Sequence, residues 1–558
     1  MVFSSAIGAP AADDPAPFAP PPLRFPALQR ASTFAEHGVV CANSSLAAQE
    51  GLAVLRKGGN AVDAAVTAAA VMSVVEPMMT GIGGDMFAMV WVEREHKLIG
   101  LNGSGRSGAG FTLDALVAKK ITSIPERGAS TITVPGALAG WAALLERYGT
   151  LSLAEALAPA IRIAEEGFLV PTRLAAQWAS FVEYVEEPEA KRIFLVDGTR
   201  APRGGELWRN PDLAKTFRAI SEKGTAYLYG GDLGQQIATA VSSQGGFLTT
   251  ADFREHHVIW VDPISVSYGK TRLWEMPPNG QGVAALESLK ILEPLPLAKM
   301  GHNSADYLHH VIEATKLAYA DLERAIGDPE FMSVSADLLT SEGFVADRRR
   351  LINPAVAQSK PGPDSRVMKS DTTYLAAADK DGNMVSFINS ICSAFGSGVV
   401  VPGTGFALQN RAVGFTLQPG RVNTVAPRRL PFHTIIPAFI TETDASGRDV
   451  PSAAFGIMGG ANQPQAHLQV FLNLVEFGFS AQEAIDAPRV RYTNELKVVL
   501  DPRIDPAVRA DLVKRGHEER RVRYTLAELF GVGHIIRRIP HGYEAASDTR
   551  ADGYPAGY

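Results

Sequence analysis

The sequence lacks the features that mark several classes of protein. It has only two cysteines in 558 residues, Cys41 and Cys392, so one disulfide is possible in number but nothing in the sequence demands it. So low a count is typical of a reducing compartment. The formal net charge of −6 provides no excess of basic residues for nucleic acid or an anionic membrane, and we expect neither as a partner.

Long hydrophobic runs are also absent. The most apolar stretch, residues 61–75, is shorter than a membrane span and carries Asp63, so we interpret it as a buried helix. The N-terminus has no basic segment followed by a continuous apolar run, which argues against a signal peptide. Because residues 1–35 are rich in proline and alanine, we expect an extended surface arm there. Because the sequence shows neither a membrane span nor a signal peptide, we expect a cytoplasmic protein.

Helical and strand patterns alternate along the rest of the chain. Residues 45–75 predict two consecutive helices, with Gly58-Gly59 ending the first and Asn60 capping the second. The segments DMFAMVWVE and KLIGLNG predict two paired strands across a charged turn. The length of the chain indicates either several structural units or one large layered domain.

A polar segment with two prolines precedes a predicted hairpin. Residues 358–371 (QSKPGPDSRVMKSD) predict an exposed loop, and TTYLAAA, DKDGN and MVSFIN then predict a strand, a turn and a strand. The loop therefore ends at Thr372, the residue that opens the hairpin. One interpretation is an ordinary surface loop followed by threonines that favour strands. The other is that cleavage after Asp371 makes Thr372 a new N-terminus.

An N-terminal threonine carries a nucleophile and a base in one residue. Its hydroxyl can attack a carbonyl, and its own α-amine, which titrates near pH 8, can take the proton. The same hydroxyl can first attack the carbonyl of Asp371 to cleave the chain. Gly459-Gly460, between a predicted strand and a predicted helix, can supply backbone N–H groups for the oxyanion, or can form a tight turn and nothing more.

A series of motifs resembles one known family. These motifs occur in the family's order: LRKGGNAVDAAVTAAAVMSVVEPMMTGIGGDMF, TVPGALAGW, LAPAIRIAEEGFLV, GGFLTTADFREH, EMPPNGQG, EATKLAYADLERAIGDP, DTTYLAAADKDGN, AIDAPRV and AASDTRADG. The chain thus resembles the γ-glutamyltransferase family of N-terminal-nucleophile (Ntn) hydrolases over nearly its whole length. The resemblance implies an αββα four-layer sandwich formed by a large subunit, residues 36–371, and a small subunit, residues 372–558.

The resemblance also implies roles for single residues. It makes Thr372 the nucleophile and Asp371–Thr372 the cleavage site, with Thr373 in support. It places Ser390 where the family has a threonine that hydrogen-bonds the nucleophile. Gly459 and Gly460 match the oxyanion-hole glycines of the family.

The sequence departs from the family where substrate is bound. Cys392 replaces an asparagine, and LQNRAVGF, residues 408–415, replaces a stretch whose aspartate binds the α-amino group of the substrate. In this chain residues 412–414 carry no charge, and Arg411 adds a positive one. His433 and Thr434 replace two serines that bind the α-carboxylate. Arg106 lies nearest to the carboxylate-clamping arginine, two residues out of register.

These departures predict a site for an anion rather than a zwitterion, because an unpaired buried ammonium costs several kcal/mol. We expect a small amide substrate whose acyl group carries a carboxylate and lacks the α-amine. Cleavage of γ-glutamyl compounds such as glutathione stays open if another acid, for example Asp85, takes part. Hydrolysis and transfer to an amine use the same acyl-enzyme, so both stay open.

Other functions are weighed against this one. A dicarboxylyl-amide acylase or an oxamate-type amidohydrolase would lack γ-glutamyl activity, and an unprocessed family member would be a non-enzymatic scaffold. We expect no cofactor and no metal, since the neighbouring histidines His256-His257 and His309-His310 would point about 100° apart on a helix. A dimer of the processed heterodimers is a possible assembly.

Overall fold

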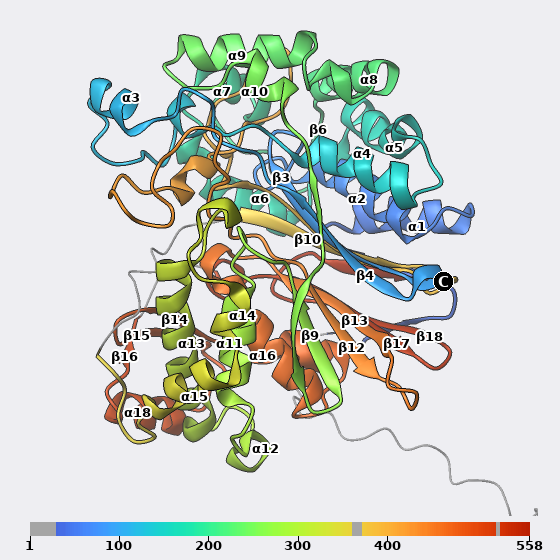
Figure 1. The fold of residues 1–558 in the computed structure, drawn as a ribbon. Helices are drawn as coiled ribbons and strands as arrows, with labels where there is room; N and C mark the ends of the chain where they lie inside the picture. Colours follow the sequence, from blue (N-terminus) through green and yellow to red (C-terminus); the bar gives the residue numbers. More distant parts are fainter. Residues whose placement is uncertain (1–29, 360–370, 521–524) are drawn as a thin grey trace, which may run out of the picture.

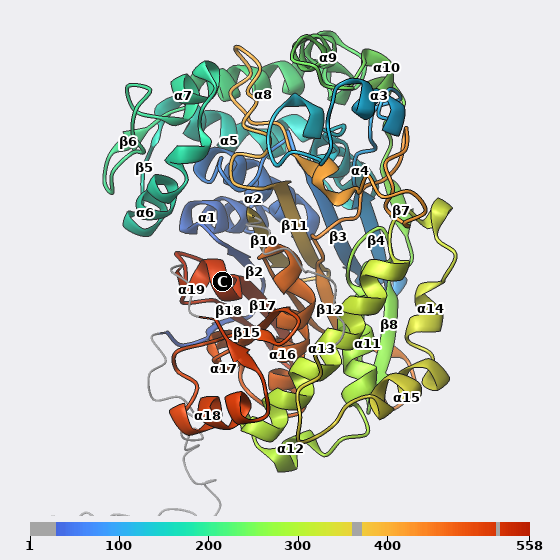
Figure 2. The same cartoon turned by 90° about the vertical axis from the view of Figure 1, so that its left-hand side faces the viewer.

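The computed structural model describes residues 30–359, 371–520 and 525–558. In these residues two antiparallel sheets lie face to face, and helices cover both outer faces (Figure 1). The same four layers are visible in the perpendicular view of Figure 2, where α1 and α2 lie on one side and α11 and α13 on the other. The predicted αββα sandwich is confirmed.

One sheet contains Thr372 and has the strand order β19-β2-β10-β11-β3-β4-β7. Its strands are β2 Val39–Ala42, β3 Asp85–Val92, β4 Lys97–Gly103, β7 Ile259–Val261, β10 Asp371–Ala378, β11 Met384–Cys392 and β19 Tyr554–Gly557. The predicted hairpins β3–β4 and β10–β11 are both confirmed.

The second sheet has the order β1-β18-β17-β13-β12-β9-β8. Its strands are β1 Thr33–Ala35, β8 Ile264–Tyr268, β9 Thr271–Glu275, β12 Ala438–Thr443, β13 Asp449–Ile457, β17 Gly533–Ile539 and β18 Gly542–Ser547. Strand β1 pairs with β18, so the last residues assigned to the N-terminal arm belong to the sheet. Residues 1–29 of the predicted arm lie outside the described part of the chain.

Strand β10 is apolar on both faces because both faces are covered. Tyr374, Ala376 and Ala378 belong to the core between the two sheets. Leu375 and Ala377 face the opposite way and pack in the core beneath the first helix layer. A strand that is buried on both sides holds the residue at its head in a fixed place.

The helix layer over the first sheet contains the two helices that the sequence predicted. Asn60 caps the second, α2, by accepting hydrogen bonds from the backbone of Val62 and Asp63, and the Asp63 side chain returns a bond to the cap. All residues of α2 are buried. The layer consists of α1 Ser45–Arg56, α2 Ala61–Val75, α4 Ala137–Tyr148, α5 Leu153–Glu166, α6 Thr172–Ser180, α7 Pro188–Phe194, α8 Pro211–Lys223, α9 Asp232–Ser243 and α10 Thr250–Arg254.

The second helix layer packs on the other sheet and includes the long predicted helix α13. It consists of α11 Val283–Leu292, α12 Leu297–Met300, α13 Ala305–Ala325, α14 Ala336–Leu339, α15 Glu342–Arg350, α16 Gln463–Val475, α17 Ala481–Asp486 and α18 Pro506–Lys514. Smaller elements are α3 Leu113–Ala118, α19 Leu526–Phe530, the pair β5 Phe168–Leu169 and β6 Leu207–Trp208, and a sheet of β14 Val490–Asn494, β15 Lys497–Leu500 and β16 Glu518–Glu519. Each described helix is too short or too polar to cross a membrane.

The structure describes only the ends of the predicted loop 358–371. Residues 360–370 lie outside the described residues, and Asp371 already belongs to β10. The pairing of β10 with β11 is irregular between Asp371 and Thr373, so Thr372 lies at a bulge. A bulge at the first residues of a strand re-aims one side chain relative to its neighbours.

Candidate active site

The hydroxyl of Thr372 is buried and hydrogen-bonded at the head of β10. Its Oγ1 donates to Ser390 Oγ on the neighbouring strand β11 across 3.1 Å. Because the proton of Thr372 points to Ser390, the lone pairs of Oγ1 stay available to attack a carbonyl. The side chain of Thr373 instead donates to the backbone oxygen of Asn389 at 3.4 Å. The hairpin therefore brings together Thr372 and Ser390, as the sequence predicted.

Ser390 Oγ also receives two other hydrogen bonds. The backbone N–H of Cys392 donates to it at 2.8 Å, and Arg411 Nη2 donates at 3.1 Å. Cys392 has a φ of 82°, which is an unfavourable backbone conformation for a residue with a side chain. This strained residue lies where the resembling family has asparagine, and it contributes its backbone to the site.

Arg411 is buried, and its guanidinium points toward residues of the protein. Nη2 reaches Ser390, Nη1 donates to Thr434 Oγ1 at 3.0 Å, and Nε lies 4.0 Å from Asp85 Oδ2. The sequence predicted Arg411 as a substrate-binding residue. The structure places Arg411 in a hydrogen bond with Ser390, the partner of Thr372, and places its charge next to a carboxylate.

Asp85 is a buried carboxylate that organises several segments. Its Oδ1 accepts hydrogen bonds from the backbone of Gly105 at 3.1 Å and Gly136 at 3.2 Å, and from Gln409 Nε2 at 2.9 Å. Its Oδ2 lies 2.9 Å from His433 Nε2. Both oxygens are thus occupied by protein groups, so Asp85 is not arranged to receive the ammonium of a substrate.

His433 is neutral in this arrangement. Burial, and next the charge of Arg411, lower its pKa to about 4, although the neighbouring Asp85 acts in the opposite direction. The neutral ring donates from Nε2 to Asp85. His433 therefore adds no positive charge at neutral pH, and the charge of Arg411 is balanced by Asp85. The local charge is less positive than the sequence indicated.

The glycine pair lies between β13 and α16. Gly459 and Gly460 have φ values of 131° and 58°, both of which favour glycine, and Gly460 begins a 3-10 turn that ends at Asn462. Successive backbone N–H groups in such a turn before a helix can bind an anion. This geometry is compatible with the predicted oxyanion role of the pair.

Two side chains that the sequence analysis did not single out fix this glycine turn. Gln281 Nε2 donates to the backbone oxygens of Gly460 at 2.8 Å and Thr434 at 2.5 Å. Tyr319 Oη donates to the backbone oxygen of Ala461. Gln281 stands in the quoted motif EMPPNGQG, but the motif alone does not indicate its partner. A continuous series of hydrogen bonds now links Thr372 to the glycine turn; its members are Thr372, Ser390, Arg411, Thr434, Gln281 and Gly460.

A cavity of about 630 Å³ begins at this series. Thr434, Gln281 and Ala461 line it on the side of the glycine turn. The rest of the wall mixes apolar and polar residues and includes one acid, Glu323, and one base, Arg421; its other members are 122–124, Tyr319, Leu322, 413–419, Asn423 and Phe432. A volume of this size accommodates a substrate much larger than a single amino acid.

The side chain of Arg106 binds other groups than those of the remaining predicted residues. Its Nη1 donates to Asp328 at 3.2 Å and to the backbone oxygen of Arg428 at 3.0 Å, and its Nη2 donates to Glu330 at 3.1 Å. With two carboxylate partners, Arg106 is not arranged as a free clamp for a substrate carboxylate. Its proposed role in substrate binding stays a prediction.

Comparison with known proteins identifies a family and several relatives of this chain. The family model described as gamma-glutamyltranspeptidase matches residues 47–558. The glutathione hydrolase-like YwrD proenzyme of Bacillus subtilis is 37% identical over 446 residues, which cover 80% of this chain and 83% of the relative. The oxamate amidohydrolase proenzyme of Klebsiella pneumoniae is 34% identical over 542 residues, with coverage of 94% and 99%.

A solved structure is similar over the whole fold. The crystal structure of cephalosporin acylase from Bacillus halodurans superposes with a TM-score of 0.89 at 41% sequence identity. The match covers 97% of this chain and 99% of that protein. The relatives thus carry the names of a glutathione hydrolase-like protein, an amidohydrolase and an acylase.

Proposed function

The chain belongs to the gamma-glutamyltranspeptidase family of Ntn hydrolases, and on this premise we propose that it is a self-processing amidohydrolase with Thr372 as its nucleophile. Cleavage between Asp371 and Thr372 would give subunits of residues 1–371 and 372–558. The observation that carries the proposal is the buried hydrogen bond of 3.1 Å from Thr372 Oγ1 to Ser390 Oγ at the head of a central strand.

Maturation uses the nucleophile before it is an N-terminus. Thr372 Oγ1 attacks the carbonyl carbon of Asp371, the hydroxyl proton passes to the nitrogen as the C–N bond breaks, and the acyl group moves from nitrogen to oxygen. Water then hydrolyses the ester, which leaves a carboxylate on Asp371 and restores the hydroxyl of Thr372. The amide nitrogen of Thr372 becomes its free α-amine. Ser390 orients the hydroxyl in this step.

Turnover repeats the attack on a substrate amide. The free α-amine of Thr372 takes the hydroxyl proton as Oγ1 attacks, and it returns a proton to the leaving amine. Backbone N–H groups of Gly459 and Gly460 stabilise the oxyanion. Water or an acceptor amine then attacks the acyl ester, so the products are a free acid or a new amide.

For the substrate we propose an acyl group that lacks an α-ammonium. Both oxygens of Asp85 are engaged by protein groups, and the cavity wall at Val413, Gly414 and Phe415 carries no acid. An ammonium beside residues 413–415 would find no carboxylate there, and Glu323 is the one acid among the described residues that line the cavity. Arg421, the one basic residue among those described residues, favours a carboxylate at the far end of the acyl chain. The volume of the cavity also suits a bulky leaving group.

A kinetic comparison tests this substrate class. We expect kcat/KM for glutaryl-p-nitroanilide to exceed that for γ-glutamyl-p-nitroanilide with the processed protein, and oxamate serves as a third substrate. Faster cleavage of the γ-glutamyl compound would overturn the proposed class and would indicate a glutathione hydrolase instead. A single uncleaved chain with no activity on any of the three would support a non-enzymatic scaffold.

Two further predictions concern the whole protein. We propose that the processed pair associates into a dimer of heterodimers in the cytoplasm. Size-exclusion chromatography with light scattering tests the assembly, and cell fractionation tests the location.

A further inference from the structure

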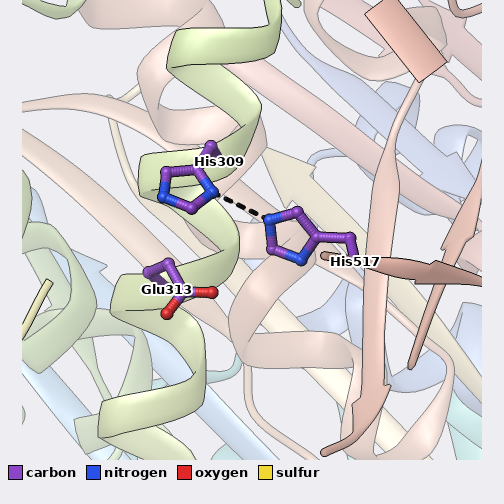
Figure 3. Close-up of side chains that lie close together, drawn as sticks. All are labelled: His309, Glu313 and His517. Atoms are coloured by element: carbon purple, nitrogen blue, oxygen red, sulfur yellow. Dashed lines mark hydrogen bonds between the residues drawn. The ribbon is translucent and has the colours of Figure 1, made fainter. Parts of the chain in front are cut away.

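Three buried side chains meet where α13 packs against the C-terminal part of the chain (Figure 3). His309 and Glu313 lie one turn apart on α13, and His517 comes from the turn between α18 and β16. One ligand atom from each residue lies within 4.8 Å of those of the other two. Among the described residues this is the one group of three or more His, Cys, Asp or Glu side chains close enough to share an ion.

The hydrogen bonds of the two histidines fix their tautomers. His309 Nε2 lies 2.8 Å from the backbone oxygen of Asn353, so this nitrogen carries the proton and donates it. The lone pair of His309 Nδ1 then faces His517 Nε2 at 2.9 Å, and His517 Nε2 supplies the hydrogen between the rings. The remaining nitrogen, His517 Nδ1, is buried and has no hydrogen-bond partner among the described residues. The two rings therefore share one hydrogen bond, and the lone pair of His517 Nδ1 is left without a donor in the described part of the chain.

Both rings are in the form that binds metals. The hydrogen bonds leave one nitrogen of each ring without a hydrogen, His309 Nδ1 and His517 Nδ1, so each ring has a lone pair to offer. A metal-ligating histidine typically donates its other ring N–H to a carbonyl or carboxylate. His309 already does so through Asn353.

We propose that His309 Nδ1, His517 Nε2 and the carboxylate of Glu313 bind one divalent transition-metal ion of the zinc type. Tetrahedral zinc–nitrogen bonds of about 2.0–2.1 Å place two imidazole nitrogens roughly 3.4 Å apart. The rings must therefore separate slightly from the 2.9 Å at which they now lie. His517 moves its proton from Nε2 to Nδ1, and the ion replaces the hydrogen between the rings. All three side chains are buried, and because they supply only three ligands, a water molecule would take the fourth tetrahedral position.

Lys316 is the main competitor of the ion. Its Nζ lies 2.6 Å from Glu313 Oε1 and 3.3 Å from the backbone oxygen of Gln358, which also donates its N–H to Glu313 Oε2. His310 and Arg515 add nearby basic groups. Metal binding requires Glu313 to turn from Lys316 toward the histidines, while Lys316 keeps the Gln358 carbonyl. Removal of the lysine charge should therefore strengthen metal binding.

The site would join the two proposed subunits. His309 and Glu313 precede the proposed cleavage point, and His517 follows it. This consequence rests on the proposed function, whereas metal binding itself does not. In the processed protein one ion would connect two separate polypeptides, and in the uncleaved chain it would connect the same segments.

The test is zinc binding by equilibrium dialysis against ZnCl2, with Co²⁺ as a spectroscopic probe. The wild-type protein should bind one Zn²⁺, and its Co²⁺ form should show the intense visible bands of a tetrahedral site. His517→Gln and Glu313→Gln should lower the affinity at least 100-fold, because loss of an outer-shell partner alone typically costs about 10–100-fold. Lys316→Met should raise it. His310→Gln is the matched control, since this neighbour on the same helix hydrogen-bonds the backbone of Asp306 instead.

Each outcome tests the metal site independently of the proposed catalytic function. Binding that is unchanged in His517→Gln, or absent from the wild-type protein at micromolar zinc, overturns the site, and no folding defect in a variant can produce the second result. Measurement on the Thr372→Ala chain separates the two proposals, because metal binding should persist there without cleavage. In the cleaved protein, EDTA should lower the urea concentration at which the subunits separate, and His517→Gln should remove this effect of EDTA.

Discussion

The hydroxyl of Thr372 and the guanidinium of Arg411 donate hydrogen bonds to the same oxygen, Ser390 Oγ, each across 3.1 Å. A fixed positive charge therefore contacts the hydrogen-bond partner of Thr372, the proposed nucleophile. Asp85 balances that charge from the far side. The arrangement holds the hydroxyl in place and sets the electrostatic field in which the α-amine of Thr372 is to act as base.

Replacement of Arg411 should change the pH dependence of catalysis. A nearby positive charge disfavours the protonated amine, so Arg411→Met should shift the acid limb of the kcat/KM profile to higher pH. Arg411→Lys keeps the charge and should keep the limb near its wild-type position while lowering kcat. The measurement is the pH–rate profile of each processed variant. Identical acid limbs in both variants would show that the charge of Arg411 does not act on the base.

Ser390→Ala should slow both processing and turnover. The change removes the acceptor of Thr372 Oγ1 and leaves two buried donors, from Cys392 and Arg411, without their partner. Misplacement of a nucleophile by about 1 Å costs on the order of 10²-fold in rate. Ser390→Thr keeps the oxygen and should restore most of the rate. Gel densitometry over time and kcat measure the two effects, and rates as low in Ser390→Thr as in Ser390→Ala would argue against the role of the oxygen.

Gly460→Ala should impair catalysis through the backbone. A side chain at a φ of 58° costs about 1–2 kcal/mol and displaces the turn whose N–H groups we propose as the oxyanion donors. Gly478, with a φ of 61°, is the matched control, since an added methyl group there meets nothing within 4 Å. We expect equal loss of stability in both alanine variants and a kcat loss of about 10²-fold only in Gly460→Ala. Equal activity in the two variants would exclude an oxyanion role for the turn.

His433 should make the protein less stable in mild acid. Its pKa is about 4 in the folded state and 6.5 when exposed, so between these values the unfolded chain binds more protons. The contribution of His433 to the free energy of unfolding then falls as pH falls, by at most about 1.4 kcal/mol per pH unit. His433→Gln lacks this titration. The stability difference, wild type minus variant, should decrease from pH 6.5 to 4.5 in urea melts, and a constant difference would contradict a buried neutral histidine.

Parts of the fold follow directly from local sequence patterns. The caps at Asn60 and Asp63 and the hairpin that carries Thr372 depend on residues close in sequence, so both were predictable. The strand Thr33–Ala35 was not, because a proline-rich arm gives no local sign that its last residues will pair with the C-terminal strand β18. Such edge pairing depends on the whole sheet.

Some contacts of the candidate site were likewise predictable from the sequence, and others were not. Thr372 and Ser390, which are 18 residues apart, meet across one hairpin, and family motifs mark both. The contacts of Arg411 with Asp85 and of Gln281 with the glycine turn join distant segments, so only the fold brings them together. His309 and Glu313 have a visible helical spacing, but His517 is 208 residues from His309, and sequence reasoning therefore predicted no metal there.

The central claim is that the backbone breaks between Asp371 and Thr372 and that the new terminus is the catalyst. Intact-mass spectrometry with N-terminal sequencing of the active protein tests this claim most directly. We expect a chain of residues 372–558 that begins TTYLAA in the wild-type protein, and a single uncleaved, inactive chain in Thr372→Ala that still folds. An active wild-type preparation with no chain that begins at Thr372, or an active Thr372→Ala variant, would contradict the mechanism.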